Sequence, residues 1–278
     1  MPSARRPLRH AGFLTGAVLV LLFAAASLLA PVLAPEDPHA VAGGGGATLE
    51  RPTARHPLGT DALGRDVLSR VLWGGRVSLA VGVGVEALVV VLGAAIGLLA
   101  GYFGGAVDAA LMRVTDVVMA FPSLVLAIGL IAVFERPGLD KVVVVLVALG
   151  WTTIARVVRG EVLSLKARDF VQAARALGGG HRAIMFRHLL PNAAAPLLVA
   201  ATIGVGGNMV AEAGLSFLGL GAQSPTISWG AMLADGQTFL DTAPWVAVFP
   251  GAALLLAVLG INLLGDGLRD LLDPRLRA

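Results

Sequence analysis

The chain has 278 residues, of which 56% are hydrophobic and 14% are charged, and its mean hydropathy is +0.83. A water-soluble core of this size cannot bury so much apolar surface, so the composition excludes an ordinary soluble domain and predicts an integral membrane protein. The absence of cysteine excludes disulfides, thiolate metal sites and a catalytic thiol. The net charge of +3 comes mainly from arginines beside apolar runs, where anionic lipid headgroups attract them, so we do not expect nucleic-acid binding.

Six apolar runs predict an all-α integral membrane protein with six transmembrane helices, because a helix needs roughly 20 residues to cross hydrocarbon. The runs are residues 11–35, 77–100, 114–134, 142–158, 193–218 and 244–264. The fourth run is short, and it spans the bilayer only if Arg156 extends its charged end to the interface. The first run ends in Val32-Leu33-Ala34, which resembles a signal-peptide cleavage site. Its apolar stretch is longer than that of a signal peptide, so we expect a membrane anchor.

Basic residues predict the orientation of these spans, because cytoplasmic segments carry an excess of lysine and arginine. Three arginines precede the first run, and the segment after the fourth run is also rich in basic residues, namely Lys166, Arg168, Arg175, Arg182 and Arg187. In contrast, residues 221–243 carry Asp235 and Asp241 and no basic residue. Both termini and the segment after the fourth run are therefore expected in the cytoplasm.

The external loop 36–76 is expected between the first two spans. Its run Gly43–Gly46 is typical of a flexible linker. Residues 61–76 could form a short helix that lies along the outer interface.

The segment 169–192, DFVQAARALGGGHRAIMFRHLLPN, is a polar insert between two apolar spans. Its small Ala173 and Ala174 leave a thin helix face that can enter a groove of another protein. Gly178 can supply the backbone freedom for a reversal of direction, and Pro191 is expected to begin a new element. The spacing predicts a short helix, a sharp turn and a second short helix, although an ordinary positively charged cytoplasmic loop is the alternative.

This insert resembles the cytoplasmic loop of importer-type ABC permeases, whose pattern is Glu-Ala-Ala, three residues, Gly, and later Leu-Pro. Further strings are similar to the C-type permease of dipeptide, oligopeptide and nickel uptake systems. They are HPLGTDALGRDVLSR (56–70), AGYFGG (100–105), MRVTDVVMAFPSLVLAI (112–128), EAGLSFLGLG (212–221), SWG (228–230) and NLLGDGLRDLLDPRLR (262–277). Their order along the chain makes the resemblance specific, and it leaves out only the first 50 or so residues.

The resemblance implies an importer-type ABC permease fold with a cytoplasmic coupling helix, in the inner or plasma membrane of a bacterial cell. It implies a second related permease, two cytoplasmic ABC ATPase subunits and an external solute-binding protein as partners, besides the lipid bilayer. The two permeases would enclose the path for uptake of short peptides, nickel or a similar small solute, and the sequence does not distinguish among these. An ion-coupled secondary transporter or channel is the alternative.

The chain is not expected to be an enzyme or to bind a cofactor, because the phosphate-binding pattern GxxxxGK[ST] is absent and neither lysine follows a glycine. ATP would be used by the partner subunits. The expected organisation is a cytoplasmic tail (1–10), an anchor (11–35), the external loop (36–76), the permease transmembrane domain (77–265) with its coupling loop (160–192), and a cytoplasmic tail (266–278).

Two sets of candidate site residues follow from the resemblance and from the charges within spans. The coupling set would contact the ATPase and comprises Asp169, Gln172, Ala173, Ala174, Ala176, Leu177, Gly178 and Pro191. Gln172 stands where the family pattern has Glu, so a charge-assisted contact would become a weaker neutral hydrogen bond.

The candidate pore-lining residues are Glu212, Asp116 and Glu86, since ionisable groups within a membrane are costly and mark functional sites. Packing against a neighbouring helix is the alternative for Glu212. His181 and His188 lack partners at metal-ligand spacing, and we expect no metal site; both are interpreted as solvated or docking residues.

Overall fold

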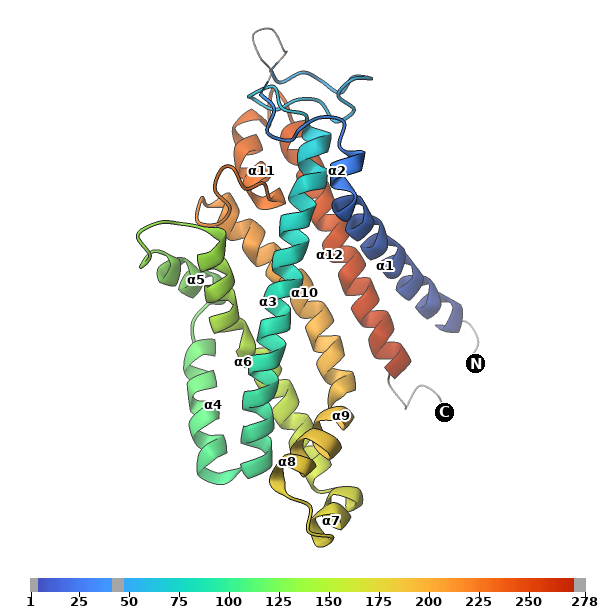
Figure 1. Cartoon of the computed structure of the whole chain (residues 1–278), viewed down its shortest axis with the longest axis vertical. Helices are drawn as coiled ribbons and strands as arrows, with labels where there is room; N and C mark the ends of the chain where they lie inside the picture. Colours follow the sequence, from blue (N-terminus) through green and yellow to red (C-terminus); the bar gives the residue numbers. More distant parts are fainter. Residues whose placement is uncertain (1–4, 42–47, 273–278) are drawn as a thin grey trace.

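The computed structural model describes residues 5–41 and 48–272, and this part of the chain is almost entirely helical, with no named strand (Figure 1). Five helices are long and apolar enough to cross a bilayer, and a bent pair of helices is a sixth candidate. The five are α1 (Arg5–Leu28), α3 (Val67–Phe103), α6 (Leu139–Lys166), α10 (Ala194–Phe217) and α12 (Trp245–Leu272). The predicted all-α membrane class is therefore confirmed.

Shorter helices lie at the two ends of this bundle. Near one end are α2 (Ala30–Leu33), α11 (Trp229–Gly236) and a single 3₁₀ turn (Gln237–Phe239). At the opposite end are α7 (Asp169–Ala176), α8 (His181–Ala183), a π-helical segment (Ile184–Leu189) and α9 (Leu190–Asn192) (Figure 1). The polar insert thus extends from one end of an otherwise apolar bundle.

Helix α3 begins earlier than expected, at Val67, and continues unbroken into the second span. The Asp66 side chain accepts a hydrogen bond from the Ser69 backbone N–H at 2.7 Å, which is an N-terminal cap. The buried Arg70 guanidinium lies near Asp61 (3.5 Å) and Asp235 (3.4 Å), so its charge is paired within the protein. The predicted separate interfacial helix at 61–76 is therefore wrong, because capping and ion pairing let one helix run through this region.

Helices α3 and α6 pack along most of their length through glycines on α3. A Cβ atom added to Gly93 would lie 2.6 Å from the Trp151 carbonyl oxygen, and one added to Gly97 would lie 2.4 Å from that of Ala155. A Cβ atom added to Gly101 would lie 2.8 Å from the Val162 side chain. Small residues at every fourth position let two membrane helices approach closely, so this seam fixes how α3 and α6 sit together.

The third predicted span, 114–134, is not one straight helix. It forms α4 (Gly105–Met119) and α5 (Ser123–Ile131), which are bent by 85° at the break between them. Pro122 cannot donate a backbone hydrogen bond, and it disfavours a helical conformation at Phe121. The break therefore follows from the Phe121-Pro122 pair, which the apolar run alone concealed.

Two ion pairs tie α4 to α6. Arg156 donates to Asp116 at 2.6 Å, and the Arg159 guanidinium makes two hydrogen bonds to Asp108, one of them at 2.7 Å. Helix α6 is longer than the predicted fourth span, so its length does not depend on Arg156 reaching a lipid interface. Arg156 has a carboxylate partner instead.

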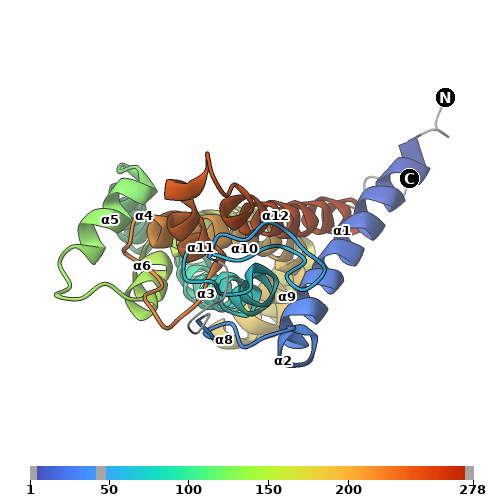
Figure 2. The same ribbon diagram turned by 90° about the horizontal axis from the view of Figure 1, so that it is seen from above.

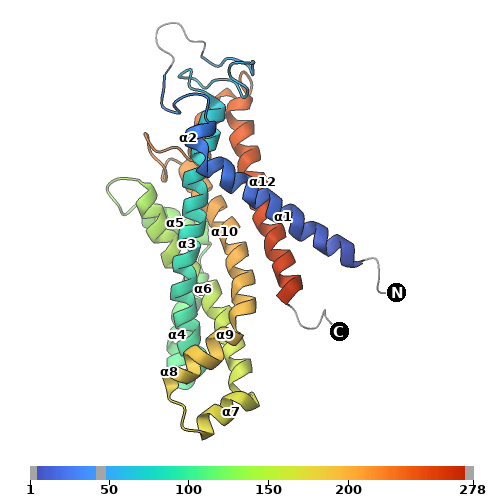
Figure 3. The ribbon, with the colours of Figure 1, turned by 45° about the vertical axis from the view of Figure 1, so that its right-hand side comes forward.

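Helices α1 and α12 lie antiparallel, and α1 stands at the side of the bundle away from α4 and α5 (Figure 2). Gly16 of α1 faces the backbone of α12 at Gly260, and Gly267 of α12 packs on Phe13. The N-terminal end of α1 therefore lies beside the C-terminal end of α12 (Figure 3).

Parts of both predicted tails are helical. Helix α1 begins at Arg5 and α12 continues to Leu272, so the expected tails 1–10 and 266–278 share the terminal helices with the first and last spans, and their place outside the membrane stays a prediction. The predicted flexible linker Gly43–Gly46 lies outside the described residues, as do residues 273–278.

Candidate functional site

The coupling element, residues 169–192, lies at the far end of the bundle, where α8 and α9 lie beside the lower end of α3 and α7 projects beyond it (Figures 1 and 3). Its first part is the eight-residue helix α7, whose Val171 is buried against the bundle. Its tip is Leu177, whose side chain is 88% exposed. An apolar side chain this exposed at a projecting turn is suited to contact another protein.

The turn that follows α7 depends on glycine. Gly178 has φ of +81°, a left-handed conformation that costs little without a Cβ atom, and a side chain there would meet open space. The Gly179 N–H donates to the Ala174 carbonyl at 2.9 Å, which closes the end of the helix in the manner of a Schellman motif. The predicted short helix followed by a sharp turn at Gly178 is therefore observed.

The second half of the element runs from His181 to Asn192 and contains a π-helical segment. Pro191 is the second residue of α9, directly after that segment, so it lies close to the start of an α-helical turn as expected. π-Helical turns are rare and mark positions where a helix is locally widened, frequently at functional sites.

The predicted coupling residues share the outer surface of this element. Apart from Ala174, which is half-buried, all of them are exposed: Asp169, Gln172, Ala173, Ala176, Leu177, Gly178 and Pro191. The Gln172 amide donates to the Lys166 carbonyl at 3.2 Å, so in this chain it braces α7 against the end of α6. Their contact with an ATPase stays a prediction.

The element is attached to the membrane-spanning part through Tyr102, near the end of α3. The Tyr102 hydroxyl lies 2.7 Å from Nδ1 of His181, and the Arg175 guanidinium lies 5.8 Å from the centre of the Tyr102 ring. The Lys166 ammonium donates to the Tyr102 carbonyl. No sequence pattern predicts this contact, because 79 residues separate Tyr102 from His181 and the interpretation of His181 as a solvated or docking residue does not include it.

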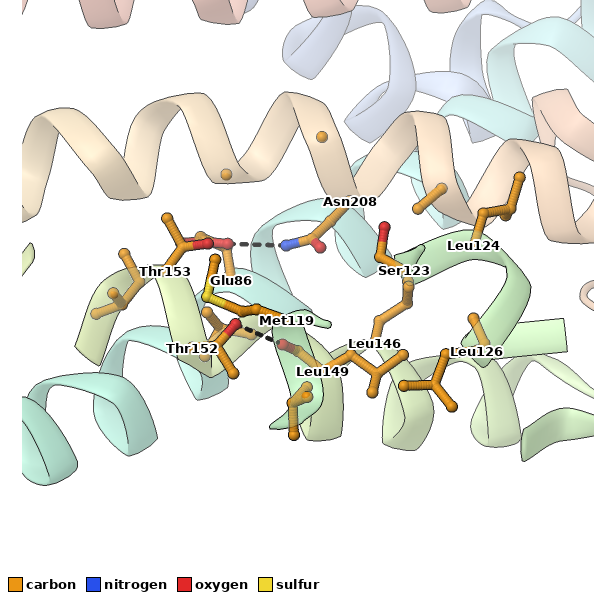
Figure 4. Close-up of a pocket in the computed structure, with 18 of the residues that line it drawn as sticks. Glu86, Met119, Ser123, Leu124, Leu126, Leu146, Leu149, Thr152, Thr153 and Asn208 are labelled. Atoms are coloured by element: carbon orange, nitrogen blue, oxygen red, sulfur yellow. Dashed lines mark hydrogen bonds between the residues drawn. The ribbon is translucent and has the colours of Figure 1, made fainter. Parts of the chain in front are cut away.

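A cavity of about 550 Å³ lies within the membrane-spanning part, between α3, the α4–α5 pair, α6 and α10 (Figure 4). Most of its wall is aliphatic. Four neutral polar residues also line it, Ser123, Thr152, Thr153 and Asn208, and Glu86 is the one ionisable residue among its described lining. Cavities of roughly this size, mainly apolar and with few polar groups, are typical of small-molecule sites.

Glu86 is only 5% exposed, so its carboxyl is held within the protein. Oε2 accepts a hydrogen bond from the Asn208 amide at 2.8 Å, whereas Oε1 has no hydrogen-bond partner among the described residues. A Cβ atom added to Gly204 would lie 2.3 Å from the Glu86 carboxyl carbon. The absence of a side chain at Gly204 therefore creates the room that the carboxyl occupies.

The other two predicted pore-lining acids do not line this cavity. Glu212 is 0% exposed, and it accepts hydrogen bonds from Ser216 (2.7 Å) and Ser78 (3.3 Å), which is the packing alternative considered for it. Asp116 is half-exposed and pairs with Arg156. A role of either in a transport path stays a prediction that these contacts do not support.

Comparison with known proteins agrees with this architecture. Residues 93–278 match the family described as binding-protein-dependent transport system inner membrane component. The chain belongs to this family. It is therefore a membrane permease subunit of an ABC importer, as the motifs predict, and the alternative of a secondary transporter or channel gains no support.

Several relatives are similar over most of their length. The chain is 43% identical over 275 residues to a putative peptide transport system permease of Brucella abortus, covering 99% of this chain and 92% of the relative. It is 41% identical over 270 residues to a di/tripeptide transport permease of Pseudomonas aeruginosa (96% and 89%). It is 42% identical over 230 residues to a dipeptide transport permease of Alkalihalophilus pseudofirmus (83% and 75%).

Proposed function

We propose that this permease imports short peptides across a bacterial cell membrane. The observation that carries the proposal is the set of relatives, which are at least 41% identical over most of the chain and bear names of peptide transport systems. The cavity beside Glu86 supports it, because its volume and aliphatic wall suit a small, partly apolar solute.

The proposed complex contains a second related permease, two cytoplasmic ATPase subunits and an external solute-binding protein. The chain itself then needs no cofactor and catalyses no reaction, since ATP hydrolysis takes place in the partner subunits. ATP binding and hydrolysis would drive the two permeases between outward-open and inward-open arrangements.

The proposed orientation places the coupling element and both termini in the cytoplasm. The positive charge of the coupling element supports this, since arginine and lysine favour the cytoplasmic side. Residues 48–66 and α11 lie at the opposite end of the bundle and would face the solute-binding protein (Figure 1).

In this account α7 and Leu177 dock into a groove of an ATPase subunit and transmit its movement to the spans. The thin alanine face of α7 and the exposed tip support this role, and the contacts at Tyr102 supply the mechanical connection to α3. The movement of α7 would thus reach the helix that carries Glu86.

Peptide uptake by cells that carry the Gly178→Asp variant tests the coupling role. A matched control is Gly105→Asp, because Gly105 also has a positive φ (+51°), also faces open space and begins α4, outside the coupling element. We expect both variants to reach the membrane in wild-type amounts and only Gly178→Asp to lose uptake. Wild-type uptake by Gly178→Asp would contradict the coupling assignment.

A further inference from the structure

The unpaired oxygen of Glu86 is unusual for a buried group in a membrane-spanning segment. Buried polar atoms are nearly always hydrogen-bonded, and an ionisable side chain without a full set of partners is costly in an apolar environment. Glu86 Oε2 has Asn208, but Oε1 has no hydrogen-bond partner among the described residues. A site of this kind is complete only when another group supplies the missing donor.

The surroundings of Glu86 show which kind of group is missing. None of the cavity-lining residues that the structure describes is basic, so no cation from this wall neutralises the carboxylate. Thr152, whose hydroxyl donates to the Leu149 carbonyl at 3.1 Å, is already engaged with its own helix. A cationic hydrogen-bond donor that enters the cavity and reaches the covered carboxyl would neutralise its charge and supply the missing donor.

The position of the carboxyl is also built into the packing. Its atoms lie against Gly204 of α10, where any side chain would displace them, and the Asn208 amide one turn later orients Oε2. Helices α3 and α10 therefore hold the acid at the cavity wall rather than leaving it to rotate toward lipid. The aliphatic lining around it would contact the apolar side chains of a small solute.

We propose that Glu86, oriented by Asn208 and seated on Gly204, binds the terminal ammonium group of a peptide during its passage through this permease. The proposal rests on the proposed function, and it adds a residue that recognises one end of the cargo. The same ammonium chemistry could come from a lysine of the second permease, and the experiment distinguishes these two sources.

The experiment measures the accessibility of the Glu86 carboxyl in the complete importer, purified with its partner subunits and embedded in lipid nanodiscs. Dicyclohexylcarbodiimide modifies protonated carboxyl groups in apolar surroundings, and mass spectrometry of the fragment that contains Glu86 reports the rate. The probes are dialanine, which has a free ammonium group, and N-acetyldialanine, which lacks it. The Glu86→Gln variant gives the background.

We expect dialanine at about ten times its dissociation constant to slow modification of Glu86 about tenfold, because only unoccupied sites react and a carboxylate paired with an ammonium group is not the protonated form that the reagent modifies. N-acetyldialanine should have no such effect. Equal protection by both probes, or by neither, overturns the proposal. A carbodiimide-induced cross-link from Glu86 to a lysine of the second permease also overturns it, since the ammonium group would then belong to the complex itself.

Uptake of alanine dipeptide and tripeptide provides a second readout with matched variants. Gly204→Ala adds one methyl group where the Glu86 carboxyl sits, whereas Gly214→Ala adds the same group on the same helix in open space, away from the residues that line the cavity. We expect Gly204→Ala and Glu86→Gln to reduce kcat/KM for uptake about tenfold, and Gly214→Ala to leave it within about twofold. If wild-type importer takes up these peptides and all three variants match it, the Glu86 assignment fails alone. If wild-type importer takes up no peptide, the proposed function fails.

Discussion

Truncation of Leu177 is the sharpest test of how the coupling element would hold its ATPase. The Leu177 side chain is 88% exposed in this chain, so almost its whole apolar surface is available for burial in a partner. Full burial of a leucine side chain contributes about 1.5–3 kcal/mol. A value of about 2 kcal/mol corresponds to roughly a 30-fold change in a dissociation constant. We therefore expect Leu177→Ala to weaken binding of the ATPase by that order.

The assay immobilises the permease pair in nanodiscs and titrates the purified ATPase subunit, with binding followed by surface plasmon resonance. Leu255→Ala is the control, because Leu255 is also well exposed but lies in α12, far from the coupling element. We expect the control to bind as wild type does. An unchanged affinity for Leu177→Ala would refute the reasoning, since an unburied tip cannot be part of the docking contact.

Three further outcomes follow from named contacts. Gly97→Ala should lower the free energy of unfolding by about 1–3 kcal/mol in thermal unfolding, because its new methyl group meets the α6 backbone. Gly84→Ala, on the same helix but facing open space, should not. Equal melting temperatures for the two variants would contradict close packing of α3 on α6 at Gly97. Tyr102→Phe removes the hydroxyl that contacts His181, and we expect ATPase turnover to persist while the number of peptides imported per ATP hydrolysed falls. An unchanged number would refute the role of Tyr102 in connecting the coupling element to α3. Glu212→Ala leaves the buried hydroxyls of Ser78 and Ser216 without their acceptor and should destabilise the protein by about 1–3 kcal/mol. We expect uptake to fall only in proportion to the amount of protein lost. Loss of uptake at normal stability would instead support a pore-lining role for Glu212.

The spans that sequence reasoning placed well are those whose limits are set by composition. The runs 193–218 and 244–264 lie within or nearly coincide with α10 and α12, because apolar residues continue until polar loop residues appear. The turn at Gly178 was also predictable, since a glycine that follows a short helix is the usual residue for a left-handed conformation.

Other features depended on contacts between distant segments. The cap of α3 at Asp66 is local, but the pairing of Arg70 with Asp235 could not be predicted because Asp235 lies far along the chain. Phe121-Pro122 can permit a kink within a span, but the 85° size of the bend could not be predicted from a continuous apolar run, where proline is tolerated without a change in hydropathy.

The candidate acids show the same limit. All three lie in apolar runs, so sequence alone does not separate them. Ser216 lies four residues after Glu212, where one helix face brings the two together, but Ser78 lies 134 residues away and could not be foreseen as a partner. The register between α3 and α10 decides which acid lines the cavity. It brings Gly204 and Asn208 against Glu86, and it places the Ser78 hydroxyl within hydrogen-bond distance of Glu212. That register is set by side-chain packing between helices and leaves no mark on hydropathy.

The most direct measurement of the central claim is a site-specific cross-link from the tip of the coupling element. Because the chain contains no cysteine, Leu177→Cys provides a single attachment point for a benzophenone maleimide, and Leu255→Cys provides the control. In native membranes, illumination of the Leu177→Cys protein should yield one product that contains an ABC ATPase subunit, and the control should not. A Leu177→Cys protein that cross-links only to lipid or to permease chains, in membranes that still import peptide, would contradict the assignment of this element to energy coupling.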